Sequence, residues 1–300
     1  MKIAFVTGAA GFTGYSLVCH LLEHGYFVNA IVRPNSGNNT RLLGINRVNI
    51  IECDIDDIIQ IVKSNKVMYR DSPEKFFFHL AWQGDRYNFV SQVKNIGMTI
   101  NALEAAAKLS CRRFISVGSQ AEYGVVNGCI HETLMPNPFC DYGAAKVSAC
   151  YLTKRRSREL GIEWIWGRIF SLYGQYEPNT RMLPNIVCKM RDCTDVYLSS
   201  CRQYWDYLNV GDAAEALIAL AENGISGEIY NIANGNYRPL REYVNIVQKQ
   251  YSSTGRIFYG GDPEPFVTLK PSIDKIMNDT GWKPRVPFEK GIEVYREMGI

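Results

Sequence analysis

Short hydrophobic runs alternate with helix-like stretches along the first half of the chain. Continuous apolar runs that end in Gly or polar residues predict strands at 2–8, 27–33, 48–54, 76–82, 113–119 and 162–169. Hydrophobic residues at helical spacing predict helices at 16–25, 95–110 and 142–160. Strands that are apolar throughout and alternate with helices are typical of a parallel sheet covered on both faces. The sequence therefore predicts an α/β fold with a doubly wound parallel sheet.

The pattern changes after about residue 170, where Pro and Gly become more frequent and the elements shorten. We predict a sheet domain at 1–170 and a smaller C-terminal α/β lobe formed by 171–202 and 226–300. The stretch 203–225 contains a helical pattern at 210–223 and is expected to return to the sheet.

Composition excludes several classes of protein. The net charge is +3 and no run of Lys and Arg stands out, so we expect neither nucleic-acid nor membrane binding. Nine Cys without a C-x-x-C pair favour a reducing, cytoplasmic location. The apolar run at the N-terminus is too short for a signal sequence or a membrane span. His20 and His24 share a helix face, but no third ligand is evident, so we predict no metal.

A glycine-rich loop, "VTGAAGFTG", joins the first predicted strand to the first helix. Gly8, Gly11 and Gly14 have the spacing of a backbone that turns sharply and lets a ligand approach a helix N-terminus. Such an N-terminus can hold a diphosphate, because its amide groups point outward without partners. The loop therefore predicts a dinucleotide site.

The end of the second strand indicates which dinucleotide binds. NAD sites usually have an acidic residue there, which holds the ribose hydroxyls. This chain has "AIVRPNS" instead, and Arg33 is suited to pair with a 2′-phosphate. We therefore expect NADP(H) in preference to NAD(H). Asp54 and Ile55 follow the third strand, where they are expected to meet the adenine.

Three residues predict proton-transfer chemistry at the same edge of the sheet. Ser119 ends the fifth strand, and Tyr142 and Lys146 begin the following helix. A Tyr hydroxyl has a pKa near ~10, and a nearby cation favours its phenolate form. Lys146 supplies that cation and Ser119 can hydrogen-bond a substrate oxygen. Tyr142 is then the group that gives or takes a proton while a nicotinamide exchanges hydride.

Together these motifs resemble the extended short-chain dehydrogenase/reductases that act on nucleotide sugars, and the resemblance covers nearly the whole chain. The glycine loop, the Ser…Y-x-x-x-K set, "NIGMT" from Asn95, "RIFSLYG" and "DTGWKP" carry it. It implies a Rossmann sheet and a nucleotide-sugar substrate. It also implies a homodimer formed through the helices at 95–110 and 142–160. Further cofactor contacts are implied for Phe12, Thr13, Leu80, Ala81, Asn95 and Phe170.

The substrate side departs from the pattern of this family. Trp205 stands where the family usually has an Arg that grips the diphosphate, so Arg202 or Arg238 is expected to substitute. The stretch 181–190 is either the loop that holds the nucleotide base or a helix start that packs on the lobe. The resemblance implies substrate contacts at Ser119, Gln120, Ser171, Leu183, Asn185, Arg202, Trp205 and Arg238.

Two activities and one non-catalytic role remain open. Dehydratases of this family carry acidic residues directly after the Ser or Thr, where this chain has Gln120 and Ala121, which argues against elimination of water. Glu122 follows, either as a substrate contact or as a carboxylate bonded to a nearby amide. NADPH-dependent reduction of a 4-keto-6-deoxyhexose linked to CDP or dTDP is the favoured function. The alternatives are a 4-epimerase and a non-catalytic NADP sensor, although a sensor would not need Tyr142 and Lys146.

Overall fold

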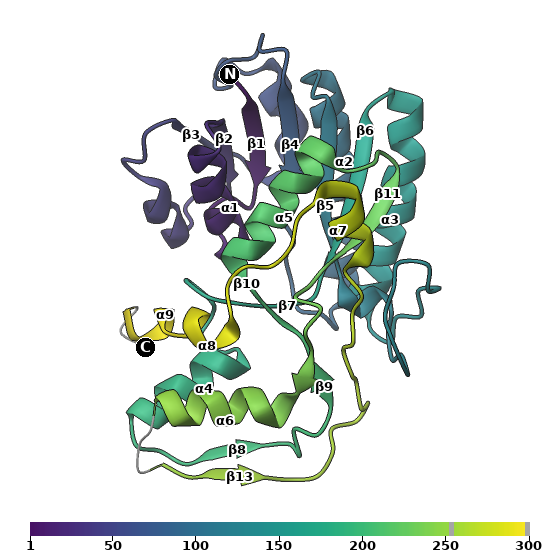
Figure 1. Cartoon of the computed structure of the whole chain (residues 1–300). Coiled ribbons are helices and arrows are strands. Elements are labelled where there is room, and N and C mark those ends of the chain that lie inside the picture. Colours follow the sequence, from purple (N-terminus) through teal and green to yellow (C-terminus); the bar gives the residue numbers. More distant parts are fainter. Residues whose placement is uncertain (252–254, 298–300) are drawn as a thin grey trace.

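A seven-stranded parallel sheet forms the centre of the protein, which is represented by a computed structural model that describes residues 1–251 and 255–297 (Figure 1). The strand order is β11-β6-β5-β4-β1-β2-β3. These strands are Ile3–Thr7 (β1), Phe27–Val32 (β2), Val48–Glu52 (β3), Lys75–His79 (β4), Arg113–Ser119 (β5), Glu163–Ile169 (β6) and Glu228–Ile232 (β11). The order reverses between β1 and β4, and ligands of such sheets bind outside the strand ends at that point.

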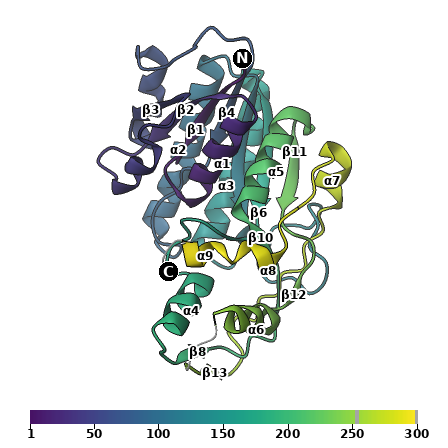
Figure 2. The same ribbon diagram turned by 60° about the vertical axis from the view of Figure 1, so that its left-hand side comes forward.

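Helices cover both faces of the sheet, as the continuous apolar strands predict (Figure 2). One face packs on α1 and α5, and the other on α2, α3 and the 3-10 helix η2. The bounds are Phe12–Glu23 (α1), Phe89–Lys108 (α2), Asp141–Leu160 (α3), Val210–Asn223 (α5), Gly37–Leu42 (η1), Ile55–Lys63 (η2) and Gln120–Glu122 (η3). The predicted α/β class is confirmed.

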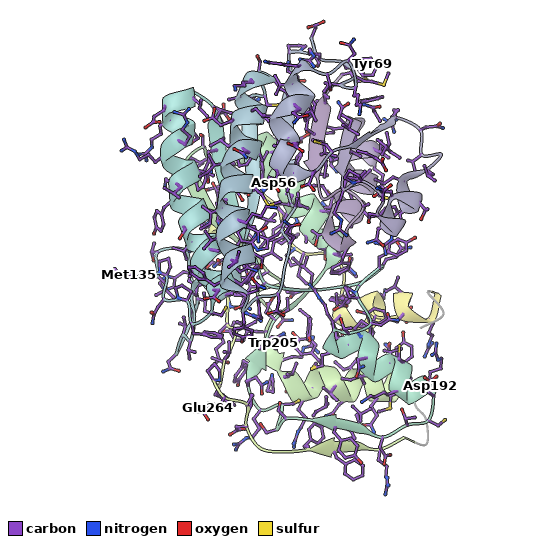
Figure 3. The ribbon with its side chains drawn as sticks, turned by 180° about the vertical axis from the view of Figure 1, so that it is seen from behind. Asp56, Tyr69, Met135, Asp192, Trp205 and Glu264 are labelled. Carbon is purple, nitrogen blue, oxygen red and sulfur yellow. The ribbon has the colours of Figure 1, made fainter. Side chains whose placement is uncertain are left out.

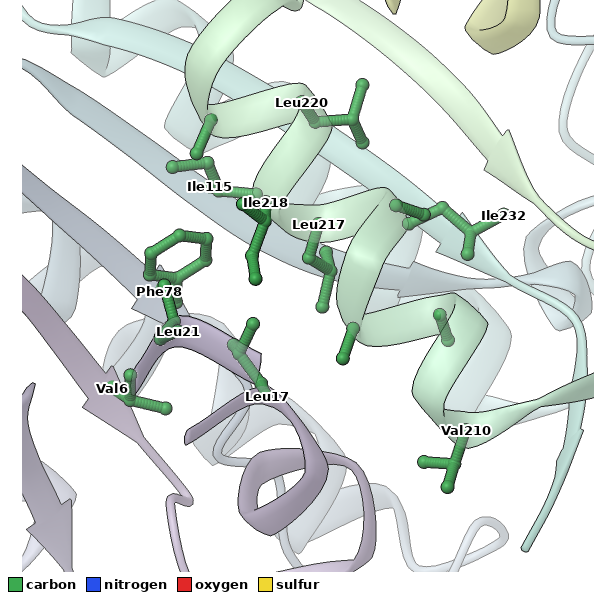
Figure 4. Packing of buried hydrophobic residues seen from close by; sticks show 14 of the residues in the cluster. Val6, Leu17, Leu21, Phe78, Ile115, Val210, Leu217, Ile218, Leu220 and Ile232 are labelled. Atoms are coloured by element: carbon green, nitrogen blue, oxygen red, sulfur yellow. The ribbon is translucent and has the colours of Figure 1, made fainter. Parts of the chain in front are cut away.

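Alternate residues along each strand contribute to the hydrophobic cores on the two faces of the sheet. Val6 of β1 points to the face where Leu17 of α1 and Leu217 of α5 meet (Figure 4). Phe5 points to the opposite face, where it stacks on Phe77 of β4. Both faces of β1 are buried, so a one-residue slip in register would exchange the two sets of side chains.

A smaller lobe lies beyond the carboxyl ends of the strands (Figure 1). Its core gathers side chains from α4, α6, α8 and the short strands around them. The bounds are Ser171–Tyr173 (β7), Met182–Arg191 (α4), Val196–Leu198 (β8), Tyr204–Trp205 (β9), Tyr207–Asn209 (β10), Arg238–Pro239 (β12), Leu240–Gln250 (α6), Ile257–Tyr259 (β13), Asp274–Thr280 (α7), Phe288–Gly291 (α8) and Val294–Glu297 (α9). Short strands pair as β10 with β7, β12 with β9 and β13 with β8.

The predicted division of the chain needs one correction. The stretch 203–225 does return to the sheet through α5, but β11 pairs with β6 as the edge strand of the sheet. Helix α7 also packs against α5 and β11. Part of 226–300 therefore belongs to the sheet domain, because α5 is followed after a short turn by β11, which completes the parallel edge of the sheet. Residues 252–254 and 298–300 of the predicted lobe lie outside the described residues.

Within residues 1–251 and 255–297, no helix combines the length and the hydrophobicity that crossing a membrane requires.

Candidate active site

The glycine loop has the geometry that its sequence predicts. Gly8 adopts a φ of 68°, in the left-handed region that favours glycine. A Cβ atom on Gly14 would lie 2.1 Å from the Gly8 carbonyl oxygen, so no larger residue fits there. Helix α1 begins at Phe12 with Gly11 as its N-cap, and no acidic side chain occupies its first turn. The loop thus leaves a glycine-lined approach to the start of a helix, which fits a dinucleotide diphosphate.

A cavity extends from this loop across the ends of β1, β2 and β3. Six predicted cofactor residues line it: Gly8, Gly11, Arg33, Asp54, Ile55 and Ala81. Val32 ends β2, and the Arg33 side chain that follows is exposed. Ser36, Asn38 and Asn39 line the same cavity and were not predicted. The end of β2 therefore presents a cation and polar groups, with no carboxylate on the residues 32–39.

A second cavity, here called the substrate cleft, lies where the lobe meets the sheet. Its lining includes Ser119, Tyr142 and Lys146, so three residues predicted to act together do converge. Predicted cofactor residues Thr13, Leu80 and Phe170 also line the substrate cleft, as do the predicted substrate residues Gln120, Ser171 and Trp205. Figure 3 labels Trp205 at the boundary between the sheet and the lobe.

Lys146 is buried and tightly placed. Its Nζ donates a hydrogen bond to the Val117 carbonyl at 2.7 Å and lies 3.6 Å from the ring centroid of Trp82. Burial lowers the pKa of Lys146 to about 7, because the charged form loses its hydration. The Trp82 ring face partly replaces that hydration through a cation–π contact. Trp82 was not predicted, although it lines both cavities.

Tyr142 lies between Trp82 and the open cleft. Trp82 meets its ring edge to face, with the centroids 5.9 Å apart. Burial raises the pKa of Tyr142, while the Ser119 hydroxyl and the charges of Arg86 and Arg181 oppose that rise. Tyr142 therefore remains protonated at neutral pH and is poised as a proton donor.

Glu122 is not a substrate contact, since its side chain is fully buried beneath Ser119. Its Oε1 accepts hydrogen bonds from the Ser119 amide at 2.9 Å and from Trp166 Nε1 at 3.0 Å. Its Oε2 pairs with Arg168 Nε at 2.7 Å. The carboxylate thus completes a capping box that holds Ser119 at the end of β5.

Three predicted cofactor residues do not line either cavity. Gly14 serves packing within the loop, and the Phe12 ring lies 5.4 Å from the Arg181 guanidinium. Asn95 is buried, and its amide bonds both the N–H and the C=O of Gln83. Asn95 therefore fixes the loop after β4 at Gln83, a residue that lines the cofactor cavity. Helix α2 also begins six residues before the predicted start, because Asn88 caps it.

Four predicted substrate residues lie elsewhere. Leu183 is buried in the core of the lobe, so α4 packs as a helix start and Leu183 does not face a base. Asn185 lies one turn into α4 and does not line the substrate cleft. Arg202 is exposed and pairs with Asp262, whereas Arg238 pairs with Glu289 beside a small neighbouring cavity. Neither arginine lines the substrate cleft.

The structure adds residues that the sequence did not single out. Arg86, after β4, and Arg181, before α4, line the substrate cleft. Among the described ion pairs, neither has a carboxylate partner. Glu177, Met182 and Tyr207 complete the lobe side. Arg181 is the first residue of the stretch 181–190. That stretch was predicted to be near the substrate, but Arg181 itself was not named as a phosphate-binding residue.

His79 and His20 are both bonded to neighbouring groups of the protein. His79 is buried, and its Nδ1 lies 2.9 Å from the Thr7 hydroxyl. Burial lowers the pKa of His79 to about 3. His20 lies with Glu23 and Glu215, whose ligand atoms are within 4.8 Å of one another, so acidic neighbours exist that the sequence did not reveal. His20 Nδ1 is already bonded to the Ser16 carbonyl oxygen.

Comparison with known proteins now decides the family. The profile of the NAD dependent epimerase/dehydratase family matches residues 4–233. The chain belongs to this family. It is 27% identical to dTDP-glucose 4,6-dehydratase of Shigella flexneri, over 97% of this chain and 91% of that protein. It is 24% identical to CDP-abequose synthase of Salmonella muenchen, over 99% and 98% of the two chains.

Solved structures agree on the fold. UDP-glucuronic acid 4-epimerase of Bacillus cereus in complex with NAD superposes with a TM-score of 0.83, at 24% identity and over 99% of both chains. The resemblance seen in the sequence motifs is therefore confirmed at the level of family and fold.

Proposed function

We propose that this protein is an NADPH-dependent reductase of the 4-keto group of a 4-keto-6-deoxyhexose linked to CDP or dTDP. The observation that carries the proposal is the composition of the substrate cleft around Tyr142. Ser119, Tyr142 and Lys146 line it together, whereas Gln120 lines it where a dehydratase has an acid. Glu122 is committed to Arg168 and cannot replace that acid. The set suits proton and hydride exchange and lacks the acid that elimination requires.

The residues of the cofactor cavity support the phosphorylated dinucleotide. When bound, the dinucleotide supplies the hydride. Arg33 and Ser36 line the cavity at the end of β2, where an NAD site carries an acidic residue. A guanidinium there attracts a 2′-phosphate by a charge-assisted hydrogen bond. The family is named for NAD. We infer the preference for NADP(H) from the residues at the end of β2.

The chain's own groups account for the proton. Ser119 hydrogen-bonds the C4 oxygen and orients it toward Tyr142. Tyr142, protonated at neutral pH, donates its proton to that oxygen as the carbonyl is reduced. Lys146 then stabilises the phenolate, because a cation near a phenol favours its charged form. Solvent that reaches the cleft restores the proton to Tyr142.

Charge in the cleft supports a nucleotide diphosphate as the rest of the substrate. Arg86 and Arg181 face the cleft. Trp205, which stands where the family usually has an arginine, lines it as well, but its indole nitrogen is shielded from solvent and has no partner among the described residues. Guanidinium groups bind phosphate oxygens through two parallel hydrogen bonds. The Shigella and Salmonella relatives are named for a dTDP-linked and a CDP-linked sugar, which supports these two nucleotides.

A second candidate function is 4-epimerisation, because Ser119, Tyr142 and Lys146 serve it equally well. Exposed apolar side chains on α2 and α3 support the expected homodimer in either case. They are Phe89, Val90, Val93, Tyr151 and Leu152.

The test mixes the purified protein with NADPH or NADH and a set of CDP- and dTDP-linked 4-keto-6-deoxyhexoses. Stoichiometric loss of the reduced-nicotinamide absorbance, with NADPH preferred, is the expected result. Interconversion of 4-hydroxy sugars at catalytic dinucleotide, without net loss of absorbance, would instead establish the epimerase. The absence of both reactions, with dinucleotide still bound, would favour a sensor.

A further inference from the structure

Glu177 is a buried carboxyl group in the substrate cleft that the proton-transfer chemistry does not use. Its residue is only 4% exposed, and it is the one acidic side chain among the described residues that line the cleft. Oε2 accepts a hydrogen bond from the Tyr295 hydroxyl. Oε1 makes no hydrogen bond to the described residues, and the side chain lines the cleft. One carboxylate oxygen is thus left for a ligand.

The loop that carries Glu177 is held from two sides. Tyr295, fully buried in α9, accepts a hydrogen bond from the Gly174 amide at 3.3 Å while it donates to Glu177. Tyr176 adopts a φ of 64°, and its ring packs perpendicular to that of Tyr15, with the centroids 5.0 Å apart. The Arg41 guanidinium lies 4.3 Å from the centroid of the Tyr176 ring. The neighbours on both sides keep Glu177 aimed at the cleft.

The groups that face Glu177 come from several elements. Burial raises the pKa of Glu177 to about 7, and Tyr295 of α9, Arg181 at the start of α4 and the backbone of Gly174 oppose that rise. Tyr207 of β10 is close enough that the negative charge of Glu177 contributes to raising the pKa of its hydroxyl. The carboxyl group therefore exchanges its proton close to neutral pH.

We propose that Glu177 accepts a hydrogen bond from a hydroxyl group of the nucleotide sugar and that Tyr295 positions it. This inference rests on the substrate class proposed above. A carboxylate is an acceptor only, so it selects a hydroxyl and repels phosphate or a carboxylate. The phosphates are left to Arg86 and Arg181. A buried group built to bond a hydroxyl also rejects an analogue that lacks it.

Calorimetric titration with dTDP-glucose, CDP-glucose, dTDP and CDP, on the wild type and Glu177→Gln, tests the first part. We expect about tenfold weaker binding of the sugar nucleotides, since a charge-assisted hydrogen bond becomes a neutral one. Unchanged binding of dTDP and CDP would place the hydroxyl on the hexose. An equal loss with dTDP and CDP would place it on the nucleoside sugar.

The titrations distinguish a failure of the Glu177 inference from a failure of the proposed function. If the wild type binds the sugar nucleotides and Glu177→Gln binds them equally well, this inference is wrong and the proposed function stands. If the wild type binds none of the four compounds, the proposed substrate class is wrong and this inference falls with it.

The pH dependence of binding tests the role of Tyr295. Affinity of the wild type should fall as the pH drops through about 7, because Glu177 gains a proton and loses its charge. Tyr295→Phe removes a bond that stabilises the carboxylate, so the midpoint should move to higher pH. Tyr251→Phe is the matched control, because its hydroxyl bonds the Ile292 carbonyl in the same C-terminal segment. A uniform loss of affinity in Tyr295→Phe, without a shift of the midpoint, would contradict the positioning role.

Discussion

The two walls of the substrate cleft are built differently. On the sheet wall, Ser119, Tyr142 and Lys146 come from the end of β5 and the first turns of α3. On the lobe wall, Glu177, Arg181, Trp205 and Tyr207 come from three separate segments, and Tyr295 of α9 holds one of them. The residues of the sheet wall are thus placed mainly by local backbone geometry, whereas those of the lobe wall are placed by contacts between distant parts of the chain.

The walls also differ in how charge is handled. The sheet wall holds its buried charges on partners of its own, since Glu122 pairs with Arg168 and the Lys146 ammonium contacts the Val117 carbonyl and the Trp82 ring. The lobe wall leaves Arg181 and one oxygen of Glu177 available to the cleft. Substitutions on the sheet wall should therefore affect catalysis and folding strongly. Substitutions that affect only the binding of substrate or dinucleotide should change the measured constants less.

Tyr142→Phe should give the largest effect. Loss of the proton donor is expected to lower kcat about 10³-fold, within the range of general acid catalysis, while NADPH binding persists. Stopped-flow reduction assays and fluorescence titration with NADPH measure the two quantities. Tyr197→Phe, an exposed residue of β8 that lines neither cavity, is the control and should leave both unchanged. Retained turnover in Tyr142→Phe would refute the assignment of the sheet wall to catalysis.

Glu122→Ala should destabilise the fold. It leaves the buried Arg168 guanidinium without its partner, and the loss of one member of a buried ion pair costs about 3–5 kcal/mol. Urea unfolding followed by circular dichroism measures the free energy of unfolding. Glu159→Ala, at an exposed pair on α3, is the control and should change stability little. A comparably small change in Glu122→Ala would mean that the network beneath Ser119 is not a structural support.

Arg33→Ala should have the smallest and most selective effect. Removal of a charge-assisted hydrogen bond to the 2′-phosphate should raise the KM for NADPH about 10–100-fold and leave the KM for NADH unchanged. Initial rates at varied dinucleotide concentration measure both constants. Arg202→Ala, whose side chain is exposed and pairs with Asp262, is the control. Equal changes for the two dinucleotides would show that Arg33 does not distinguish them.

Much of the sheet wall was predictable from local patterns. The glycine spacing and the Tyr142–Lys146 pair act within one turn or one helix, so their geometry follows from the backbone alone. Asn95 was located correctly on its helix but its partner was misjudged. Its amide bonds the loop at Gln83, twelve residues earlier, which helical spacing does not reveal.

The lobe wall could not be predicted in the same way. Arg202 and Arg238 were as plausible as Arg181, because sequence does not show which arginines meet carboxylates in space. The structure pairs them with Asp262 and Glu289, about fifty to sixty residues away. Trp82 was missed for a related reason, since its contact with Lys146 joins two elements that only the sheet brings together.

The sequence by itself determined the family, the parallel sheet, the glycine loop and the convergence of Ser119, Tyr142 and Lys146. These depend on short-range backbone geometry and on the periodicity of buried side chains. Only the tertiary structure decided that β11 joins the sheet, that Glu122 is a buried support and that Glu177 faces the substrate cleft. The partners and burial of those groups come from segments far apart in the chain, and the charge state and accessibility of a side chain follow from such partners.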